Sequence, residues 1–93
     1  MKYRLEFTRQ YLKDLKLARK RHLDEGKLND ILLKLLNGEK LPSSNKDHAL
    51  KGDYKDCREC HITPDWLLIY SVGTSLKIIT LVRTGCLLYT SDA

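Results

Sequence analysis

The chain has 93 residues, of which 42% are hydrophobic and 31% charged, the balance of one soluble globular domain rather than a disordered or membrane protein. Seventeen Lys and Arg against twelve Asp and Glu give a net charge of +5, which favours an anionic partner, although it also serves solubility alone. The sequence has no apolar run near the ~20 residues of a membrane-spanning helix and its N-terminus lacks a secretion signal, so we expect a cytoplasmic protein with free thiols and no membrane partner.

The first part of the chain predicts one strand and two helices. Residues 3–7, YRLEF, alternate as a strand does, and Thr8 follows as a helix N-cap. Apolar residues then recur every three or four positions as far as His22, with basic residues on or near the opposite face. The same spacing from Leu28 to Leu36 predicts a second, core-facing helix, which Asn37-Gly38 ends.

The second part predicts a loop followed by three strands. EKLPSSNKDH, at 39–48, has the composition of a loop, and strand-like runs follow at 54–62, 66–72 and 75–82. The short turns between these runs require antiparallel neighbours. We therefore expect a single α+β domain over residues 1–93, with an N-terminal strand, a two-helix hairpin on one face, and a three-strand antiparallel meander completing a four-stranded sheet.

The stretch CRECH, residues 57–61, matches the attachment signature of a c-type haem. In a strand, however, Cys57 and Cys60 point to opposite faces. Haem attachment also requires export, and Met1 is the only methionine that the sequence offers as a second axial ligand. Zinc requires four converging ligands, and the sequence has neither a second CxxC nor an HxxxH pair. We expect no haem and no metal here.

Polar residues gather where the loop and the predicted strands meet. They are His48, His61, Asp65 and Trp66, with Lys51, Lys55, Arg58 and Arg83 nearby in sequence or on adjacent strands. Two histidines beside a phosphate can exchange protons with a ribose 2′-hydroxyl and a leaving oxygen, a carboxylate can orient a histidine, and cations can stabilise the phosphorane. The pattern is compatible with metal-independent ribonuclease chemistry. Composition and pattern alone nevertheless favour surface histidines, a turn-forming aspartate and a core tryptophan.

A resemblance to a known family favours the catalytic interpretation of these residues. KDHALKGDYKDCRECHITPDWLLIY, at 46–70, with RTG at 83–85, resembles the YafQ branch of the RelE/ParE superfamily of bacterial toxins. The likeness includes YLKDLKLARKRH, at 11–22, and so covers nearly the whole chain up to Gly85. Its most specific part is H-x-x-P-D-W-x-x-I-Y, and CRECH belongs to the same block. The haem signature is therefore interpreted as a coincidence.

The resemblance implies a type II toxin that pairs with an antitoxin, enters the A site of the 70S ribosome and cuts mRNA there. The 2′-hydroxyl would attack the adjacent phosphate without metal or organic cofactor. By position, His48 and His61 would be the active-site histidines and Asp65 the catalytic aspartate, with Trp66 shaping the pocket and Arg83 contacting phosphate. Which histidine is the base stays open. The basic helix faces would contact ribosomal RNA.

The resemblance ends after Gly85. The family usually continues with Thr-His, and that histidine is a main candidate for protonating the leaving 5′-oxygen, whereas Leu87 stands at its position here. We interpret 86–93, CLLYTSDA, as the translation of a transposase-type sequencing adapter, TGT CTC TTA TAC ACA TCT GAC GCT, that replaces the native C-terminus. If the tail is genuine, the alternative is a catalytically impaired antitoxin- or RNA-binding domain. A third alternative, the gyrase-poisoning branch, is disfavoured by the two histidines and the aspartate.

Overall fold

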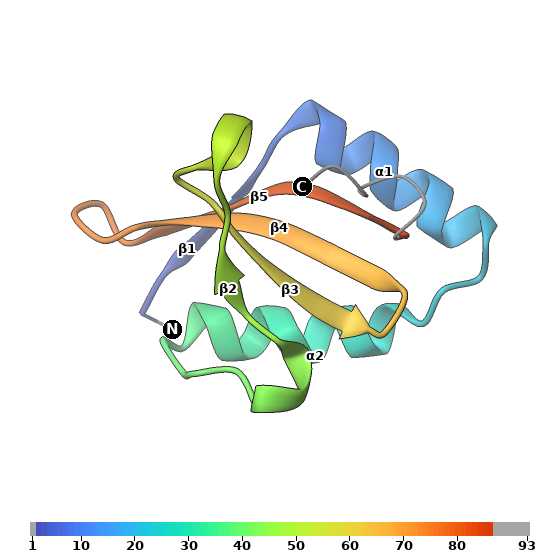
Figure 1. The fold of residues 1–93 in the computed structure, drawn as a ribbon, viewed down its shortest axis with the longest axis horizontal. Helices are drawn as coiled ribbons and strands as arrows, with labels where there is room; N and C mark the ends of the chain where they lie inside the picture. Colours follow the sequence, from blue (N-terminus) through green and yellow to red (C-terminus); the bar gives the residue numbers. More distant parts are fainter. Residues whose placement is uncertain (1, 87–93) are drawn as a thin grey trace.

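Two helices and a five-stranded sheet make up residues 2–86, which are the residues that the computed structural model describes (Figure 1). In chain order the elements are β1 (Arg4–Phe7), α1 (Arg9–Lys20), α2 (Glu25–Leu36), the 3-10 helix η1 (Ser43–Asn45), β2 (His48–Ala49), the 3-10 helix η2 (Gly52–Tyr54), β3 (Arg58–Thr63), β4 (Trp66–Gly73) and β5 (Ile78–Cys86). The strand order in the sheet is β1-β5-β4-β3-β2. The predicted α+β class is confirmed.

Both helices begin at polar caps. The Thr8 side chain accepts a hydrogen bond from the backbone N–H of Tyr11 at 3.0 Å, as the sequence predicts, and Asp24 caps α2 in the same way. The apolar stripe of α2 is buried as expected. In α1 only two residues are buried, Tyr11 and Ala18, while Leu12 and Leu17 remain exposed. The apolar stripe of α1 is therefore narrower than its sequence indicates.

The predicted four-stranded sheet is wrong in its strand count. His48 and Ala49 form the extra strand β2, which pairs antiparallel with Glu59 and Arg58 of β3. A strand of two residues is too short to show an alternating pattern, so the sequence gives no sign of it. The last strand is also displaced: β5 begins at Ile78 because Lys77, with a φ of 57°, closes the preceding turn in the left-handed region.

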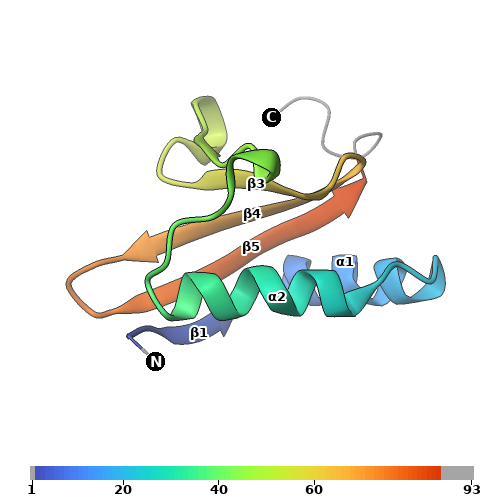
Figure 2. The same ribbon diagram turned by 90° about the horizontal axis from the view of Figure 1, so that it is seen from below.

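The arrangement of the helices differs from a simple pair on one face. β1 pairs in parallel with only the first part of β5, and Thr8 then turns the chain into α1, which runs beside the second part (Figure 1). α2 lies across one face of the sheet (Figure 2), and both helices contribute to a core with β3, β4 and β5. The opposite face carries η2 and the segment around it (Figure 1). That face holds the polar residues discussed below.

The two cysteines of CRECH lie in different environments. Cys60 lies in the core with no exposed surface, and burial raises the pKa of its thiol to about 12. His61 follows on the other face of β3, while Cys57 precedes the strand. None of the helices within residues 2–86 is long and apolar enough to cross a membrane.

Candidate functional site

The register of the sheet aligns four side chains in one row across β2, β3, β4 and β5. His48 lies opposite Glu59, Glu59 opposite Ile69, and Ile69 opposite Arg83. Directly opposite residues share a face of a sheet, and so do residues two apart on one strand, which brings His61 to the same face. The predicted histidine pair is therefore on the face turned away from α2, with Glu59 between them along β3.

His48 is held at both ring nitrogens. Its Nδ1 lies 2.8 Å from the main-chain oxygen of Lys46, and its Nε2 lies 3.4 Å from Oε1 of Glu59. A carbonyl oxygen can only accept a hydrogen bond, so Nδ1 carries a proton. The imidazole is half exposed, whereas the Glu59 side chain is 8% exposed. Its Oε2 has no hydrogen-bond partner among the described residues.

His61 is held by main-chain groups at the end of β3. Its Nδ1 lies 3.2 Å from the carbonyl oxygen of Pro64, which again requires a proton on Nδ1. Its own carbonyl oxygen accepts from Nδ2 of Asn45 at 2.7 Å. The imidazole borders a surface hollow whose lining also includes Lys46, Asn45 and Pro64. Lys46 thus fixes one histidine through its main chain and lines the hollow beside the other.

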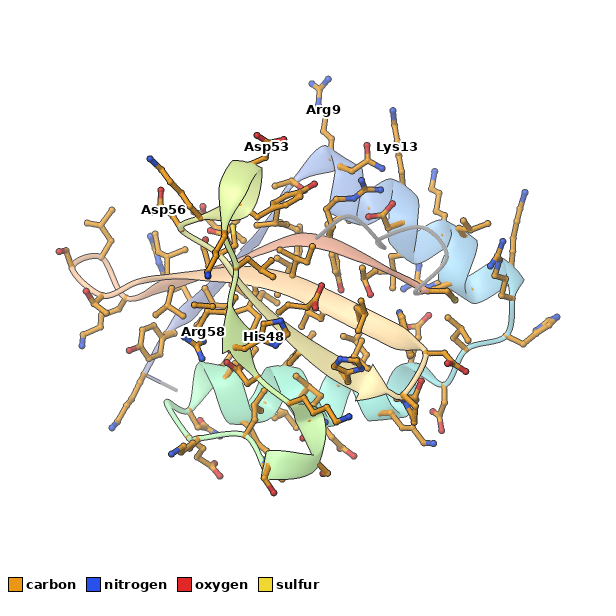
Figure 3. The ribbon with its side chains drawn as sticks, viewed as in Figure 1. Arg9, Lys13, His48, Asp53, Asp56 and Arg58 are labelled. Atoms are coloured by element: carbon orange, nitrogen blue, oxygen red, sulfur yellow. The ribbon has the colours of Figure 1, made fainter. Side chains whose placement is uncertain are left out.

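Three of the predicted site residues, Asp65, Lys51 and Lys55, are solvent-exposed. Asp65 lies in the turn between β3 and β4, and its carboxylate makes no hydrogen bond or ion pair with the rest of residues 2–86. Lys51 and Lys55 flank η2. Asp53 and Asp56, from the same segment, project in Figure 3 well away from His48. The roles of Asp65 and the two lysines stay predictions.

Arg58 lies apart from the histidines' face. Its Nε donates to Asp47 at 2.6 Å, and the phenol of Tyr70 donates to the other oxygen of the same carboxylate. The hydrogen bond with Asp47 raises the pKa of Arg58. Strand alternation puts Arg58 on the side of Cys60, opposite His61. A phosphate bound beside His61 would therefore not meet this guanidinium directly.

Arg83 and Trp66 are both fixed by hydrogen bonds. The Nε and a terminal nitrogen of Arg83 donate to the two oxygens of Asp14 at 3.1 Å each, which raises the pKa of the guanidinium. The backbone N–H of Thr84 donates to the same carboxylate at 3.2 Å. Trp66, 1% exposed, donates from Nε1 to the Thr84 hydroxyl at 2.8 Å. Asp14 therefore links α1 to the strand that carries Arg83.

Sequence reasoning missed three residues that organise this region: Glu59, Lys46 and Asp14. Strand alternation puts Glu59 on the face of His61, and this was the available signal, but its partner His48 lies on the strand β2, which the sequence does not reveal. Asp14 is separated from Arg83 by 69 positions, and no local pattern predicts their contact. Within residues 2–86 there is no group of three or more His, Cys, Asp or Glu residues placed to hold a metal ion.

Comparisons with known proteins agree with one another. Residues 3–86 match the family model described as "Bacterial toxin of type II toxin-antitoxin system, YafQ". The mRNA interferase toxin YafQ of Escherichia coli is 44% identical over 82 residues, which are 87% of each chain. The crystal structure of an E. coli YafQ is 38% identical, with a TM-score of 0.87 over 95% of this chain and 97% of that one. YafQ in the E. coli DinJ-YafQ complex is 39% identical, with a TM-score of 0.84 over 94% and 96%.

Proposed function

We propose that this chain, which belongs to the YafQ family of bacterial type II toxins, is an endoribonuclease that cuts mRNA in the ribosomal A site. The observation that carries the proposal is that His48 and His61 lie on one face of the sheet. In each ring, Nδ1 is bonded to a main-chain oxygen, so the other ring nitrogen, Nε2, points away from that bond. An mRNA interferase activity is also what the relative from E. coli is named for.

The proposed reaction is a transesterification that requires no metal. One histidine removes the proton of a ribose 2′-hydroxyl, and the oxygen attacks the adjacent phosphorus. The bond from phosphorus to the 5′-oxygen breaks, and that oxygen takes up a proton from the other histidine. The products are a 2′,3′-cyclic phosphate and a 5′-hydroxyl. Lys46 beside His61 and Arg83 beyond Ile69 are the cations that we assign to the phosphorane, with Lys51 and Lys55 as further candidates. Asp65 is assigned to orient the substrate or a histidine.

The proposed partners are the 70S ribosome with its mRNA and a cognate antitoxin, in the cytoplasm. A DinJ-YafQ complex is known for the E. coli relative, which supports an antitoxin partner here. Arg9 and Lys13 project from the outer side of α1 in Figure 3, and such a basic surface suits contact with ribosomal RNA. Binding through these residues should weaken as the salt concentration rises.

The proposal is tested with purified ribosomes carrying a defined message. The full chain should cut the A-site codon and leave a cyclic phosphate, and a variant with both His48→Gln and His61→Gln should not. The matched control is Glu6→Gln, which changes an exposed residue on β1, at the opposite edge of the sheet from β2. Absence of A-site cleavage by the parent chain would overturn the proposal.

The alternative is a catalytically impaired domain that binds antitoxin or RNA. Leu87 is the observation that favours it, because a leucine cannot donate a proton to the leaving oxygen. Position 87 lies outside the described residues, as does almost all of the stretch 86–93 that we interpret as adapter-derived. Resequencing the gene beyond codon 85 tests the interpretation. A chain carrying Thr-His after Gly85 that cuts, beside a parent chain that only binds antitoxin, would establish the alternative for the parent.

A further inference from the structure

Arg83 is joined to Asp14 of α1 by a two-point contact. Its Nε and one terminal nitrogen donate to the two oxygens of the Asp14 carboxylate at 3.1 Å each. A paired contact of this kind fixes the plane of the guanidinium as well as its distance from the carboxylate. The second terminal nitrogen takes no part in the pair, so its N–H groups can serve another acceptor. Asp14 therefore orients Arg83 without using all of its donors.

Asp14 is also fixed by groups other than Arg83. Its carboxylate accepts from Nε2 of Gln10 at 3.0 Å and from the backbone N–H of Thr84 at 3.2 Å. The Thr84 hydroxyl in turn accepts from Nε1 of the buried Trp66 at 2.8 Å. Because these bonds do not involve the guanidinium, the Asp14 carboxylate should keep its place when Arg83 is shortened.

Arg83 is the more exposed member of the pair and lies on the face of the histidines. Its side chain is 30% exposed, against 10% for Asp14. The register places Arg83 across Ile69 from Glu59, so RNA on this face can reach the guanidinium, whereas the Asp14 carboxylate is largely shielded. The hydrogen bond to Asp14 and, after it, one with Tyr54 of η2 raise the pKa of Arg83. Arg83 is therefore a charged donor held between α1 and η2.

We propose that Asp14 is a positioning residue that holds Arg83 in the orientation in which it donates to a phosphate of the message. This inference rests on the proposed function and gives a part in the reaction to α1, which carries none of the residues assigned to it above. An unrestrained arginine loses rotamer freedom when it binds a phosphate, whereas a guanidinium fixed in advance loses less. Donors oriented in advance stabilise the charge that develops on a transferring phosphoryl group.

The charge of Asp14 separates orientation from simple attraction. Asp14→Asn removes a negative charge beside Arg83, so attraction alone would make RNA bind more tightly and would not slow cleavage. The positioning role predicts instead that single-turnover cleavage on saturating programmed ribosomes falls by about tenfold. Asp30→Asn, the same change at an exposed position of α2, is the matched control and should cut at the parent rate. Cleavage by Asp14→Asn at the parent rate or faster would overturn the proposal.

Arg83→Lys makes the complementary change and leaves Asp14 in place. Lysine keeps the positive charge but cannot make the planar two-point contact, so cleavage should fall at least as far as in Asp14→Asn. This single variant decides the question even where Asp14→Asn fails to fold. A fully active Arg83→Lys would show that charge suffices and that orientation by Asp14 does not matter.

Rescue by guanidinium ions gives a readout that a purely structural contact between α1 and β5 would not provide. Arg83→Ala removes the head group and leaves the Asp14 carboxylate, with which a guanidinium ion from solution can form the same two-point contact. Guanidinium at non-denaturing concentrations should raise cleavage by Arg83→Ala about tenfold, and methylammonium should not. The variant carrying both Asp14→Asn and Arg83→Ala should not respond. Equal rescue with and without the carboxylate, or rescue of neither, would contradict the positioning role.

Nitrogen NMR of the Arg83 side chain separates failure of this inference from failure of the proposed function. A short oligoribonucleotide should shift the Nε–H signal of Arg83 in the parent chain, and the shift should be lost in Asp14→Asn. If the parent does not cut the message on ribosomes, the proposed function fails, and this titration then decides whether Asp14 positions Arg83 for a phosphate. A shift of the same size in both proteins would overturn the inference.

Discussion

Two carboxylates lie next to the short strand β2: Asp47 precedes it in the chain, and Glu59 lies opposite His48 on β3. They differ in their hydrogen-bond and ionic partners. Asp47 bonds to the permanent cation of Arg58 and to the phenol of Tyr70. Glu59 is more deeply buried, at 8% side-chain exposure against 18%, yet it faces only a titratable imidazole and leaves one oxygen without a partner within residues 2–86. The more deeply buried carboxylate is therefore the less well compensated one.

This difference in partners distinguishes a carboxylate that stabilises the fold from one that can take part in proton transfer. A carboxylate bonded to an arginine and a tyrosine at once stabilises the fold and has little capacity left for a substrate. A buried carboxylate whose only cation can lose its proton costs stability, and such groups are frequent at sites of proton transfer. Asp47 should then matter for folding and Glu59 for cleavage, and substitutions can test each half of that contrast.

The largest effect is expected from Glu59→Met. Methionine fills a similar volume without a charge, so the free energy of unfolding should rise by about 1 kcal/mol, because an under-compensated buried carboxylate is removed. Cleavage on programmed ribosomes should nevertheless fall by roughly 10²-fold, since His48 loses the carboxylate that its Nε2 faces at 3.4 Å and that fixes the orientation of the ring. Denaturant titration and single-turnover cleavage give the two quantities.

His48→Gln is the matched variant for this result. If Glu59 acts through His48, adding Glu59→Met to His48→Gln should cause little further loss of cleavage. Losses that simply multiply would mean that Glu59 acts independently of the imidazole. A lower stability in Glu59→Met would mean that the buried carboxylate contributes to folding as Asp47 does, and the contrast between the two would disappear.

Asp47→Asn should give the opposite result. The amide keeps the shape but removes the charge that accepts from Arg58 and Tyr70, which should lower the free energy of unfolding by about 2 kcal/mol. Arg58 is 44% exposed and regains water, which limits the loss. Cleavage per folded molecule should stay within a few-fold of the parent. A stable variant that no longer cuts would place Asp47 in the reaction rather than in the fold.

Tyr70→Phe should have a smaller effect, which depends on pH. Removal of the phenol costs about 1 kcal/mol, since Asp47 keeps its bond to Arg58. Burial first, and then the hydrogen bond to Asp47, raise the pKa of Tyr70 above its ordinary 10.0. A raised pKa means that the stabilisation by the neutral phenol is complete below pH 10 and is lost as the pH rises through the folded-state value.

The stability of Tyr70→Phe should therefore fall less steeply than that of the parent above pH 10. Burial also raises the pKa of Tyr11 and of Cys60 to about 12 each. Both proteins therefore still lose some stability at alkaline pH. Thermal unfolding across this range measures the difference. Parallel curves for the two proteins would show that Tyr70 is not the source.

The elements with a long repeating pattern could be predicted from sequence, and the short ones could not. α2 repeats its apolar spacing over three turns, so its existence and its buried side were predictable. β2 has two residues, and its pairing with β3 is decided by tertiary contacts. The number of strands was therefore wrong although the fold class was right.

The candidate site was also predictable only in part. His48 and His61 were identified by resemblance, and the register puts them on one face. The partner of His48 was not predictable, since a glutamate in an alternating strand usually faces solvent, and the pairing of Glu59 with His48 depends on the added strand β2. Arg58 was grouped with the site by its position in sequence, although alternation along β3 directs it to the other face.

The smallest effect is expected from a third carboxylate, Glu25, whose contact with Arg19 looks as favourable as that of Asp47 with Arg58. The two side chains of this pair are 37% and 58% exposed, and the pKa of Glu25 is lowered chiefly by its hydrogen bond to Arg19. Exposed pairs lose little when broken, because water replaces the partner. Glu25→Gln should therefore leave both the unfolding midpoint and cleavage unchanged within error. If it destabilised the protein as much as Asp47→Asn, burial would not be the property that distinguishes these carboxylates, and the contrast between Asp47 and Glu59 would need another cause.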